Sequence, residues 1–189
     1  MALFLSKEGF NVTATEPEET MANQIREKVT DHPIHVFTKT MQQIGEFEET
    51  FDGIYCIGNT LVHLNNLEEV NGFLHQVHRK LNDDGVFICQ IVIFEKVLNQ
   101  QDFAFPIIQK ENFKFKRRYD ISEDKVLFTT AITSNGQSIS NTTSLCPITS
   151  QQLLPILKNS GFQTIETYGD FEKGPYSANS PALIVVARK

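Results

Sequence analysis

The chain has 189 residues, of which 40% are hydrophobic and 21% charged, a composition typical of one folded globular domain. Its formal net charge of −6 argues against a general phosphate-binding surface, so we expect no nucleic-acid partner. No apolar stretch approaches the roughly 20 residues that a membrane span requires, so we expect no membrane contact.

The first third of the chain predicts alternating helices and strands. The predicted elements are a helix end at 2–7, a strand at 10–15, a helix at 18–29 and a strand at 34–38. Gly9 is placed to stop the first helix. Met21, Ile25 and Val29 recur at helical spacing, so we expect them to share the apolar face of the second helix.

The middle of the chain predicts a strand, a helix and a second strand. Residues 51–59 form the clearest strand, and their apolar run from Ile54 to Ile57 favours burial on both faces, as in a parallel sheet. Apolar residues mark one face of a helix at 67–81. Asp83-Asp84-Gly85 predicts a turn before a strand at 86–93.

Past Leu98 the pattern changes to alternating polar and apolar residues. The segments 113–121, 126–133 and 138–145 predict an antiparallel meander, with Asn135-Gly136 as a hairpin turn. Thr149 or Ser150 then caps a helix, and two closing strands are expected at 162–168 and 182–187. The fold class is therefore α/β: a mostly parallel sheet with flanking helices and an antiparallel β-meander insertion.

Two compositional features bear on compartment and partners. The cysteines Cys56, Cys89 and Cys146 have no metal-binding spacing and no disulfide framework, so we expect no metal and a reducing, cytoplasmic compartment. The basic run at 114–118 is interpreted as a solvated strand or loop face, in preference to a nucleic-acid patch.

Three motifs in this order resemble those of a known enzyme family. They are LSKEGFNVTATEPEETM at 5–21, FDGIYCIGNTLVHLN at 51–65 and KLNDDGVFICQIV at 80–92. Together with the closing helix, Gly161-Phe162 and two strands, they resemble class I S-adenosylmethionine-dependent methyltransferases, the Rossmann-like small-molecule methyltransferases. The resemblance implies methyl transfer from S-adenosyl-L-methionine to a small-molecule acceptor.

The resemblance also implies how the chain is organised. One methyltransferase-like domain spans 1–189. Residues 1–98 would bind the cofactor, 99–148 would form the β-rich insertion over the acceptor site, and 149–189 would supply the closing helix and strands. Phe105, Phe113, Phe115 and Tyr119 are candidates to line the acceptor pocket, although core packing is the commoner role of such residues.

The candidate cofactor residues follow predicted strands, where open α/β sheets bind ligands. They are Glu16, Thr40, Met41, Ile57, Gly58 and Asn59. Glu16 would accept hydrogen bonds from both ribose hydroxyls of the cofactor. Alternatively, Glu16 is an acid near the start of a helix, where the helix dipole favours a carboxylate. Thr40 stands where relatives usually present an acid or amide to adenine. We expect these segments to surround one crevice.

Each of the other candidates has a structural alternative. Met41 would pack on the adenine face or in the core, and Gly58 would allow a close ligand approach or form a plain turn. His63 would orient or deprotonate the acceptor, or act as a structural hydrogen-bonding group. Tyr119 is the second candidate for acceptor binding, and no residue is assigned as catalytic.

One family feature does not occur in the sequence. The family's first strand and glycine-rich loop should precede Ala2, and the chain contains no Gly-x-Gly pattern. That strand normally lies between the strands at Val12 and Tyr55, so we expect an N-terminally incomplete fold. The sequence leaves three alternatives open. The two strands pair directly with each other, another chain completes the sheet through self-association, or this is a fragment of a longer gene product.

The missing loop affects the expected function. Without its backbone donors we expect weak S-adenosylmethionine binding, near millimolar. Two other functions stay open on the sequence: a non-catalytic, methyltransferase-derived binding protein, and a different nucleotide-binding α/β enzyme such as a dehydrogenase.

Overall fold

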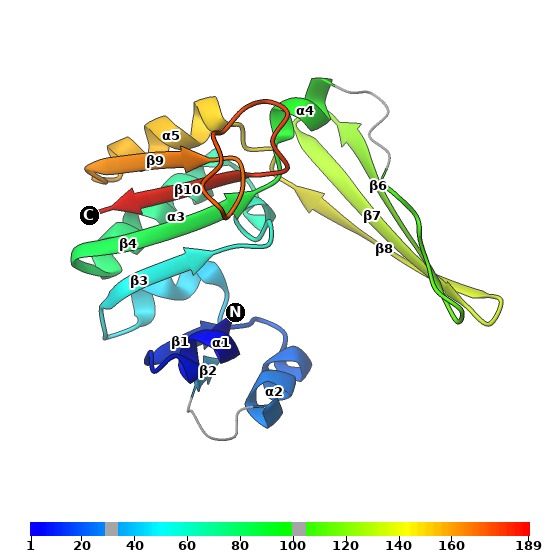
Figure 1. Cartoon of the computed structure of the whole chain (residues 1–189), viewed down its shortest axis with the longest axis horizontal. Helices are drawn as coiled ribbons and strands as arrows, with labels where there is room; N and C mark the ends of the chain where they lie inside the picture. The colour runs from blue at the N-terminus through cyan, green and yellow to red at the C-terminus, as the bar shows by residue number, and fades with distance from the viewer. Residues whose placement is uncertain (29–33, 100–104) are drawn as a thin grey trace. The chain divides into compact units, whose positions relative to one another are not determined.

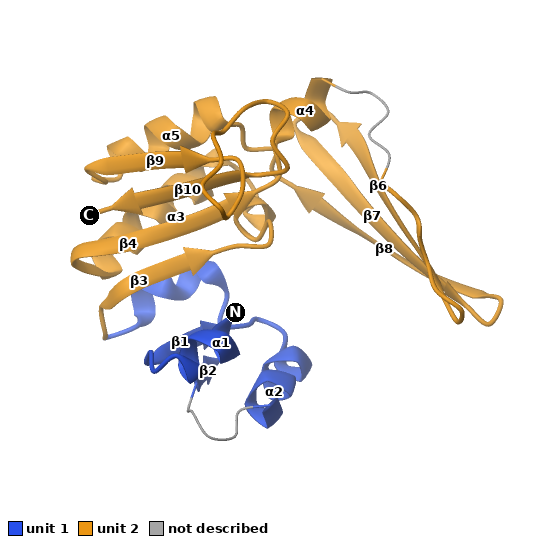
Figure 2. Cartoon of the chain, in the orientation of Figure 1, with its two compact units in different colours: residues 1–48 blue, residues 49–189 orange. Residues whose placement is uncertain are grey.

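The computed structural model describes residues 1–28, 34–99 and 105–189 (Figure 1). The chain divides into two compact units, residues 1–48 and 49–189 (Figure 2). Each unit is therefore described by itself. Val29, expected on the apolar face of the second helix, lies outside the described residues.

The first unit is a small α/β unit built around two parallel strands. Its elements are α1 (Ala2–Lys7), β1 (Val12–Thr15), α2 (Glu19–Lys28), β2 (Ile34–Phe37) and the 3₁₀ helix η1 (Met41–Glu46). β1 pairs with β2 in parallel, from Val12 opposite Ile34 to Thr15 opposite Phe37. The alternating helices and strands predicted for this segment are confirmed.

The apolar face predicted for α2 is wrong in one position. Met21 is 49% exposed, whereas the neighbouring Ala22 is fully buried. A small side chain allows the helix to approach β2 closely, and Met21 lies one residue away from the buried face. The periodicity therefore located the helix correctly but misplaced the face that it buries.

The second unit contains a four-stranded sheet flanked by helices. Its strands lie in the order β3-β4-β10-β9 (Figure 1). Their bounds are β3 (Phe51–Cys56), β4 (Leu81–Ile91), β9 (Thr164–Tyr168) and β10 (Leu183–Arg188). β3 is parallel to β4, and β10 is antiparallel to both β4 and β9. β3, β4 and β9 thus share one direction, which confirms the mostly parallel sheet.

Helices α3 (Leu67–Lys80) and α5 (Ser150–Asn159) contribute buried faces to the core of this unit. α3 buries Val70, Leu74 and Val77, as its sequence pattern predicted. Asn66 caps α3, because its side-chain oxygen accepts the backbone N–H of Glu69 at 2.9 Å. The largest side chain of the central strand is Phe87, which is fully buried.

Two predictions for the strands next to this core need correction. Burial of β3 on both faces is wrong: Tyr55 is 37% exposed, because β3 is the edge strand of its sheet. The turn at Asp83-Asp84-Gly85 is instead an irregularity within β4, whose pairing with β3 shifts register between Phe51 and Gly53. Asp84 has a φ of 62° there. Asn82 next to this bend donates to Asp52 at 2.7 Å.

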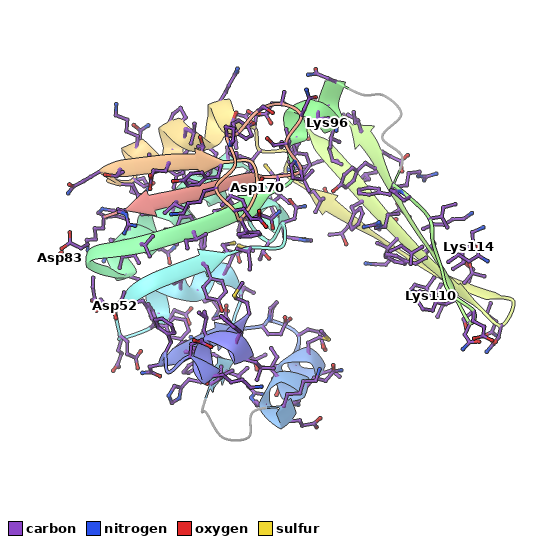
Figure 3. The ribbon with its side chains drawn as sticks, in the orientation of Figure 1. Asp52, Asp83, Lys96, Lys110, Lys114 and Asp170 are labelled. Carbon is purple, nitrogen blue, oxygen red and sulfur yellow. The ribbon has the colours of Figure 1, made fainter. Side chains whose placement is uncertain are left out.

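The predicted meander is confirmed as a separate four-stranded antiparallel sheet. Its strands are β5 (Ile108–Gln109), β6 (Lys114–Ser122), β7 (Lys125–Ser134) and β8 (Gln137–Leu145). Asn135 and Gly136 connect β7 to β8 with φ values of 51° and 76°, the left-handed pair that a tight hairpin requires. Lys110 and Lys114 lie toward the end of this sheet at which β7 and β8 are connected (Figure 3). The sequence did not predict β5 or the short helix α4 (Phe94–Asn99).

The closing helix begins and ends as expected. Thr149 precedes α5, and its N–H and hydroxyl both donate to the side chain of Gln152 at 3.0 Å. Gly161 follows the helix with a φ of 106°. A Cβ on Gly161 would lie 2.9 Å from the ring of His78 on α3, so glycine is required there both for backbone conformation and for space.

This geometry predicts opposite effects for two glycine-to-alanine changes. Gly161→Ala should lower the free energy of unfolding by about 1–3 kcal/mol, because alanine strains a left-handed residue and contacts His78. Gly72→Ala, in α3 with nothing within 4 Å of the added Cβ, should raise it by about 0.5–1 kcal/mol. Urea unfolding of both variants checks this, and equal effects of the two changes would contradict it.

The strands on either side of the expected first strand belong to different sheets. Within the described part of the chain, β1 is hydrogen-bonded to β2 and β3 to β4. The three alternatives that the sequence raised for the missing first strand stay predictions.

Candidate functional site

The turn that follows β3 has an unusual backbone. Gly58 and Asn59 both lie in the left-handed region, with φ values of 77° and 65°. Asparagine tolerates this conformation better than most residues, and glycine adopts it freely. Two consecutive left-handed residues reverse the chain sharply at the carboxyl end of β3, before the 3₁₀ helix η2 (Leu61–His63).

Hydrogen bonds tie this turn to the carboxyl end of β4. The N–H of Gly58 donates to the side-chain oxygen of Gln90 at 2.7 Å, and the N–H of Asn59 donates to the Gln90 carbonyl at 3.2 Å. The side chain of Asn59 in turn accepts the N–H of Val92 at 3.0 Å. The Gly58-Asn59 turn is therefore held in one conformation by the neighbouring strand.

Sequence reasoning did not identify Gln90 as part of this arrangement. Its only signal was a polar residue in the apolar run of β4, close to the strand's carboxyl end. A polar side chain at such a position needs a hydrogen-bond partner, and the Gly58 N–H is that partner.

In the first unit, Glu16 directly follows β1. Its N–H donates to the Phe37 carbonyl at 3.1 Å, which joins the ends of the two parallel strands. One carboxylate oxygen accepts the N–H of Glu18 at 3.1 Å. The other oxygen has no hydrogen bond to any residue that the structure describes, so it can accept a ligand hydroxyl.

Thr40 and Met41 follow β2 at the same end of the β1–β2 pair, since parallel strands end at one edge. The N–H of Thr40 donates to the side-chain oxygen of Gln43 at 2.9 Å, and its hydroxyl donates to the same oxygen at 3.3 Å. Thr40 thus begins η1, which is a structural role. Met41 is half-buried at the first position of η1.

His63 ends η2 with an exposed side chain. Its imidazole has no hydrogen bond to the residues described in 1–28, 34–99 and 105–189. The backbone of this segment is fixed by its neighbours: the Thr60 hydroxyl donates to the Ile57 carbonyl at 2.8 Å, and the His63 N–H to the Thr60 carbonyl at 3.1 Å. The structural role considered for this imidazole, a hydrogen bond, is therefore not seen within these ranges.

Tyr119 is the centre of an aromatic cluster on the meander. Its ring lies 4.9 Å from Phe105, 5.2 Å from Phe128 and 6.4 Å from Phe94, measured between centroids. Tyr119 is only 9% exposed. Burial raises the pKa of the Tyr119 hydroxyl, an effect that the nearby charge of Arg117 partly opposes. The phenol is therefore uncharged at neutral pH.

The base of the meander is attached to the segment that follows the Gly58-Asn59 turn. The N–H of Cys146 donates to the Val62 carbonyl in η2 at 2.8 Å. The ammonium of Lys125 contacts the Asn65 carbonyl. On the other side of the cluster, Phe94 starts α4 only two residues after Val92. The cluster and the turn thus belong to one connected region of the second unit.

The basic run is a solvated face only in part: Lys116 and Arg118 are exposed, whereas Lys114 and Arg117 are half-buried. By strand alternation, Lys114, Lys116 and Arg118 share one face of β6, and Arg118 pairs with Asp120 at 2.7 Å. Arg117 lies on the opposite face with Tyr119 and is half-buried. Assigning the residues of this run to alternate faces of the strand would have separated Arg117 from its basic neighbours.

The candidate residues are divided between the two units. Glu16, Thr40 and Met41 follow parallel strands of the first unit, and the 57–59 segment and Tyr119 belong to the second. The single crevice expected from the sequence stays a prediction. In the ranges described, no group of three or more metal-ligating side chains occurs, and no helix is long and apolar enough to cross a membrane.

Comparisons with known proteins agree with the resemblance seen in the sequence. A family model described as "Methyltransferase domain" matches residues 1–85. Glycine/sarcosine N-methyltransferase of Aphanothece halophytica is 26% identical over 198 residues, covering 98% of this chain and 70% of that protein.

Two solved structures share the fold. An S-adenosylmethionine-dependent methyltransferase from Clostridium acetobutylicum superposes with a TM-score of 0.81 at 12% identity, covering 95% of this chain and 75% of the other. The CcbJ methyltransferase from Streptomyces caelestis gives 0.84 at 20% identity, covering 99% and 78%. The fold, the motifs and these similarities are those of the class I, Rossmann-like, S-adenosylmethionine-dependent methyltransferases, which this chain resembles.

Proposed function

We propose that this methyltransferase transfers the methyl group of S-adenosylmethionine to the nitrogen of a small amine. The similarity to a glycine/sarcosine N-methyltransferase along 98% of the chain favours an amine nitrogen over an oxygen or carbon acceptor. The observation that carries the proposal is the connection, within one unit, between the Gly58-Asn59 turn and the aromatic cluster around Tyr119.

The cluster is suited to a small organic acceptor. Phe94, Phe105 and Phe128 surround a protonated phenol with apolar surface, which excludes water from a neighbouring amine. The meander that carries most of these rings is fixed at its base to η2. In this proposal the meander provides the acceptor side of the site, and the carboxyl ends of the strands provide the cofactor side.

The cofactor side is assigned to the residues that follow the strands. Glu16 has one carboxylate oxygen without a partner in the described ranges, which suits a bond from a ribose hydroxyl. Met41 would lie against the adenine ring. In the second unit, Ile57 and the Gly58-Asn59 turn are assigned to the same cofactor, and Thr40 would act only by starting η1.

The reaction requires positioning more than acid–base chemistry. When bound, S-adenosylmethionine supplies a methyl group on a positively charged sulfur. The acceptor nitrogen must be unprotonated and in line with the carbon–sulfur bond; a new nitrogen–carbon bond forms, the sulfur becomes a neutral thioether, and the product ammonium then loses a proton. We assign His63, an exposed imidazole on η2, as the group that takes this proton, since histidine exchanges protons near neutral pH.

The assignment of Glu16 predicts a specific loss of affinity. Glu16→Gln should weaken S-adenosylmethionine binding by about 1–3 kcal/mol, the scale for a hydrogen bond to a charged acceptor. Isothermal titration calorimetry of the parent and the variant measures this change.

Glu27→Gln is the matched control, because Glu27 is an exposed carboxylate within α2. It removes the same charge from the same unit and should leave the affinity unchanged. Equal affinities for the parent protein and Glu16→Gln would remove Glu16 from the ribose role.

The acceptor class is tested by a panel of small compounds. Formation of S-adenosylhomocysteine is measured with glycine, with sarcosine, and with the hydroxy acid that replaces the amine of glycine by a hydroxyl group. We expect turnover with the amines and none with the hydroxy acid. Turnover with the hydroxy acid alone would contradict the proposed amine acceptor.

A further inference from the structure

Two of the three cysteines lie opposite each other in neighbouring strands. Cys56 is the last residue of β3, and the parallel register of β3 and β4 pairs it with Cys89. Paired residues of neighbouring strands point to the same face of the sheet. For Cys89 this is the buried face, which also carries Phe87 and Ile91. The two thiols therefore lie side by side on one face of the sheet.

The spacing of the two strands suits a disulfide bond. Neighbouring strands lie about 4.8 Å apart, within the roughly 4.4–6.8 Å over which a disulfide joins two Cα atoms. Both cysteines are free thiols, and the Cys89 thiol is hydrogen-bonded to the Cys56 sulfur. The two sulfur atoms therefore already face each other before any oxidation.

The two thiols differ in reactivity. The hydrogen bond to Cys56 and burial together raise the pKa of the Cys89 thiol, so Cys89 keeps its proton at neutral pH. Cys56 is 7% exposed at the end of its strand, whereas Cys89 is fully buried. Cys56 is therefore the sulfur that a small oxidant reaches first, and Cys89 is the thiol that resolves the oxidised product.

The reaction balances with hydrogen peroxide as the oxidant. The Cys56 thiol takes one oxygen atom from the peroxide, which leaves as water, and becomes a sulfenic acid. The Cys89 sulfur then attacks the Cys56 sulfur, and the hydroxyl group of the sulfenic acid leaves with the Cys89 proton as a second water. Two electrons pass from the thiols to the peroxide, so that two thiols and one peroxide give one disulfide and two waters.

A disulfide at this position acts directly on the Gly58-Asn59 turn. Gln90, which directly follows Cys89, accepts the N–H of Gly58 at 2.7 Å and the N–H of Asn59 at 3.2 Å. The Cβ atoms of a disulfide lie about 3.8 Å apart, so the bond draws the two strand ends closer than their usual spacing of about 4.8 Å. Such N–H···O bonds span only about 2.7–3.2 Å. The shorter bond has no room to contract and the longer one none to stretch.

We propose that Cys56 and Cys89 form an oxidation site, at which a peroxide makes a reversible disulfide that releases the Gly58-Asn59 turn from Gln90. The consequence for catalysis rests on the proposed function, which assigns this turn to the cofactor. Oxidised protein should then bind S-adenosylmethionine about tenfold more weakly than reduced protein, because the turn is no longer held in one conformation.

Peptide mapping by mass spectrometry tests the disulfide directly. Folded protein is treated with hydrogen peroxide, the remaining thiols are alkylated, and the protein is digested without a reducing agent. We expect the peptides that contain Cys56 and Cys89 to be joined with the loss of two hydrogen atoms, and dithiothreitol to separate them. Peroxide treatment that leaves both thiols free, or oxidises them without joining them, would overturn the proposal.

The backbone amide signals of Gly58 and Asn59 report the effect on the turn. In NMR spectra of ¹⁵N-labelled protein they should shift when the parent is oxidised and return on reduction. They should not respond to peroxide in Cys56→Ser, which lacks the first thiol. Cys146→Ser is the matched control, because Cys146 is a buried free cysteine that follows β8, and it should respond like the parent. A disulfide that forms without moving these signals would contradict the release of the turn.

The two proposals fail in different ways. If the disulfide forms and the turn signals shift, but reduced protein methylates no amine, the oxidation site stands and the proposed reaction is wrong. If reduced and oxidised protein methylate amines equally well although the disulfide has formed, the reaction stands and the effect of oxidation on the site is wrong.

Discussion

Replacing Phe87 with alanine is expected to lower the free energy of unfolding by about 3–5 kcal/mol, the usual cost of truncating a buried phenylalanine. Phe87 is fully buried in β4. Its ring lies 6.4 Å from that of Phe73 on α3 and 6.0 Å from that of Phe162, which follows α5. The cavity would therefore lie between the central strand and both helices. Urea unfolding followed by circular dichroism measures the loss.

The chain offers a matched control for this change. Phe171, in the loop between β9 and β10, is 62% exposed, so Phe171→Ala should change the free energy of unfolding by no more than about 0.5 kcal/mol. A loss below about 1 kcal/mol for Phe87→Ala would mean that the second unit does not have the core described here.

Substitution of Asn59 should have the largest effect at the site. Asn59→Ala removes the acceptor of the Val92 N–H and places alanine in a left-handed conformation. The strain amounts to about 1–2 kcal/mol and the unsatisfied N–H to about 1–3 kcal/mol, so a loss on the order of 2–5 kcal/mol is expected. The same variant should also lose methyl transfer, because the Gly58-Asn59 turn would no longer be fixed to β4.

Two further variants separate these causes. Asn59→Gly removes the acceptor but tolerates the backbone conformation, so it should be less destabilising than alanine. Asn59→Asp keeps an oxygen acceptor and should be the mildest of the three. Unfolding free energies in any other order would contradict this account of the turn.

Local signals in the sequence predicted most of the fold. Asn135-Gly136 specifies a hairpin because both residues adopt positive φ readily, and the structure has that turn. Thr149 and Gly161 mark the two ends of α5 for equally local reasons. Such signals depend only on a few neighbouring residues, so they can be recognised in a single sequence.

The errors concern features that depend on tertiary packing. Tyr55 belongs to an apolar run typical of a central strand, yet its strand is the edge of the sheet in the described part of the chain. Ala22, not Met21, is buried in α2, because close packing selects a small side chain there. Neither strand order nor packing distance can be obtained from periodicity alone.

The sequence predicted which segments contribute to the site but not how those segments are arranged. Strand ends located Glu16 and the 57–59 segment, but Gln90 was missed because a long-range hydrogen bond to Gly58 gives it its role. Arg117 was grouped with its basic neighbours, because charge was counted along the chain and not by strand face. The shared crevice, and the weak cofactor affinity expected from the absent Gly-x-Gly pattern, stay predictions.

The measurement that tests the central claim most directly uses S-adenosylmethionine with a deuterated methyl group. The protein is incubated with glycine and about millimolar labelled cofactor, a concentration that allows for weak binding, and the products are analysed by mass spectrometry. The account predicts that the intact deuterated methyl group appears on the glycine nitrogen, together with S-adenosylhomocysteine, and that both decrease in Asn59→Ala. Labelled cofactor that remains unchanged in the presence of folded protein and glycine or other small amines would contradict it.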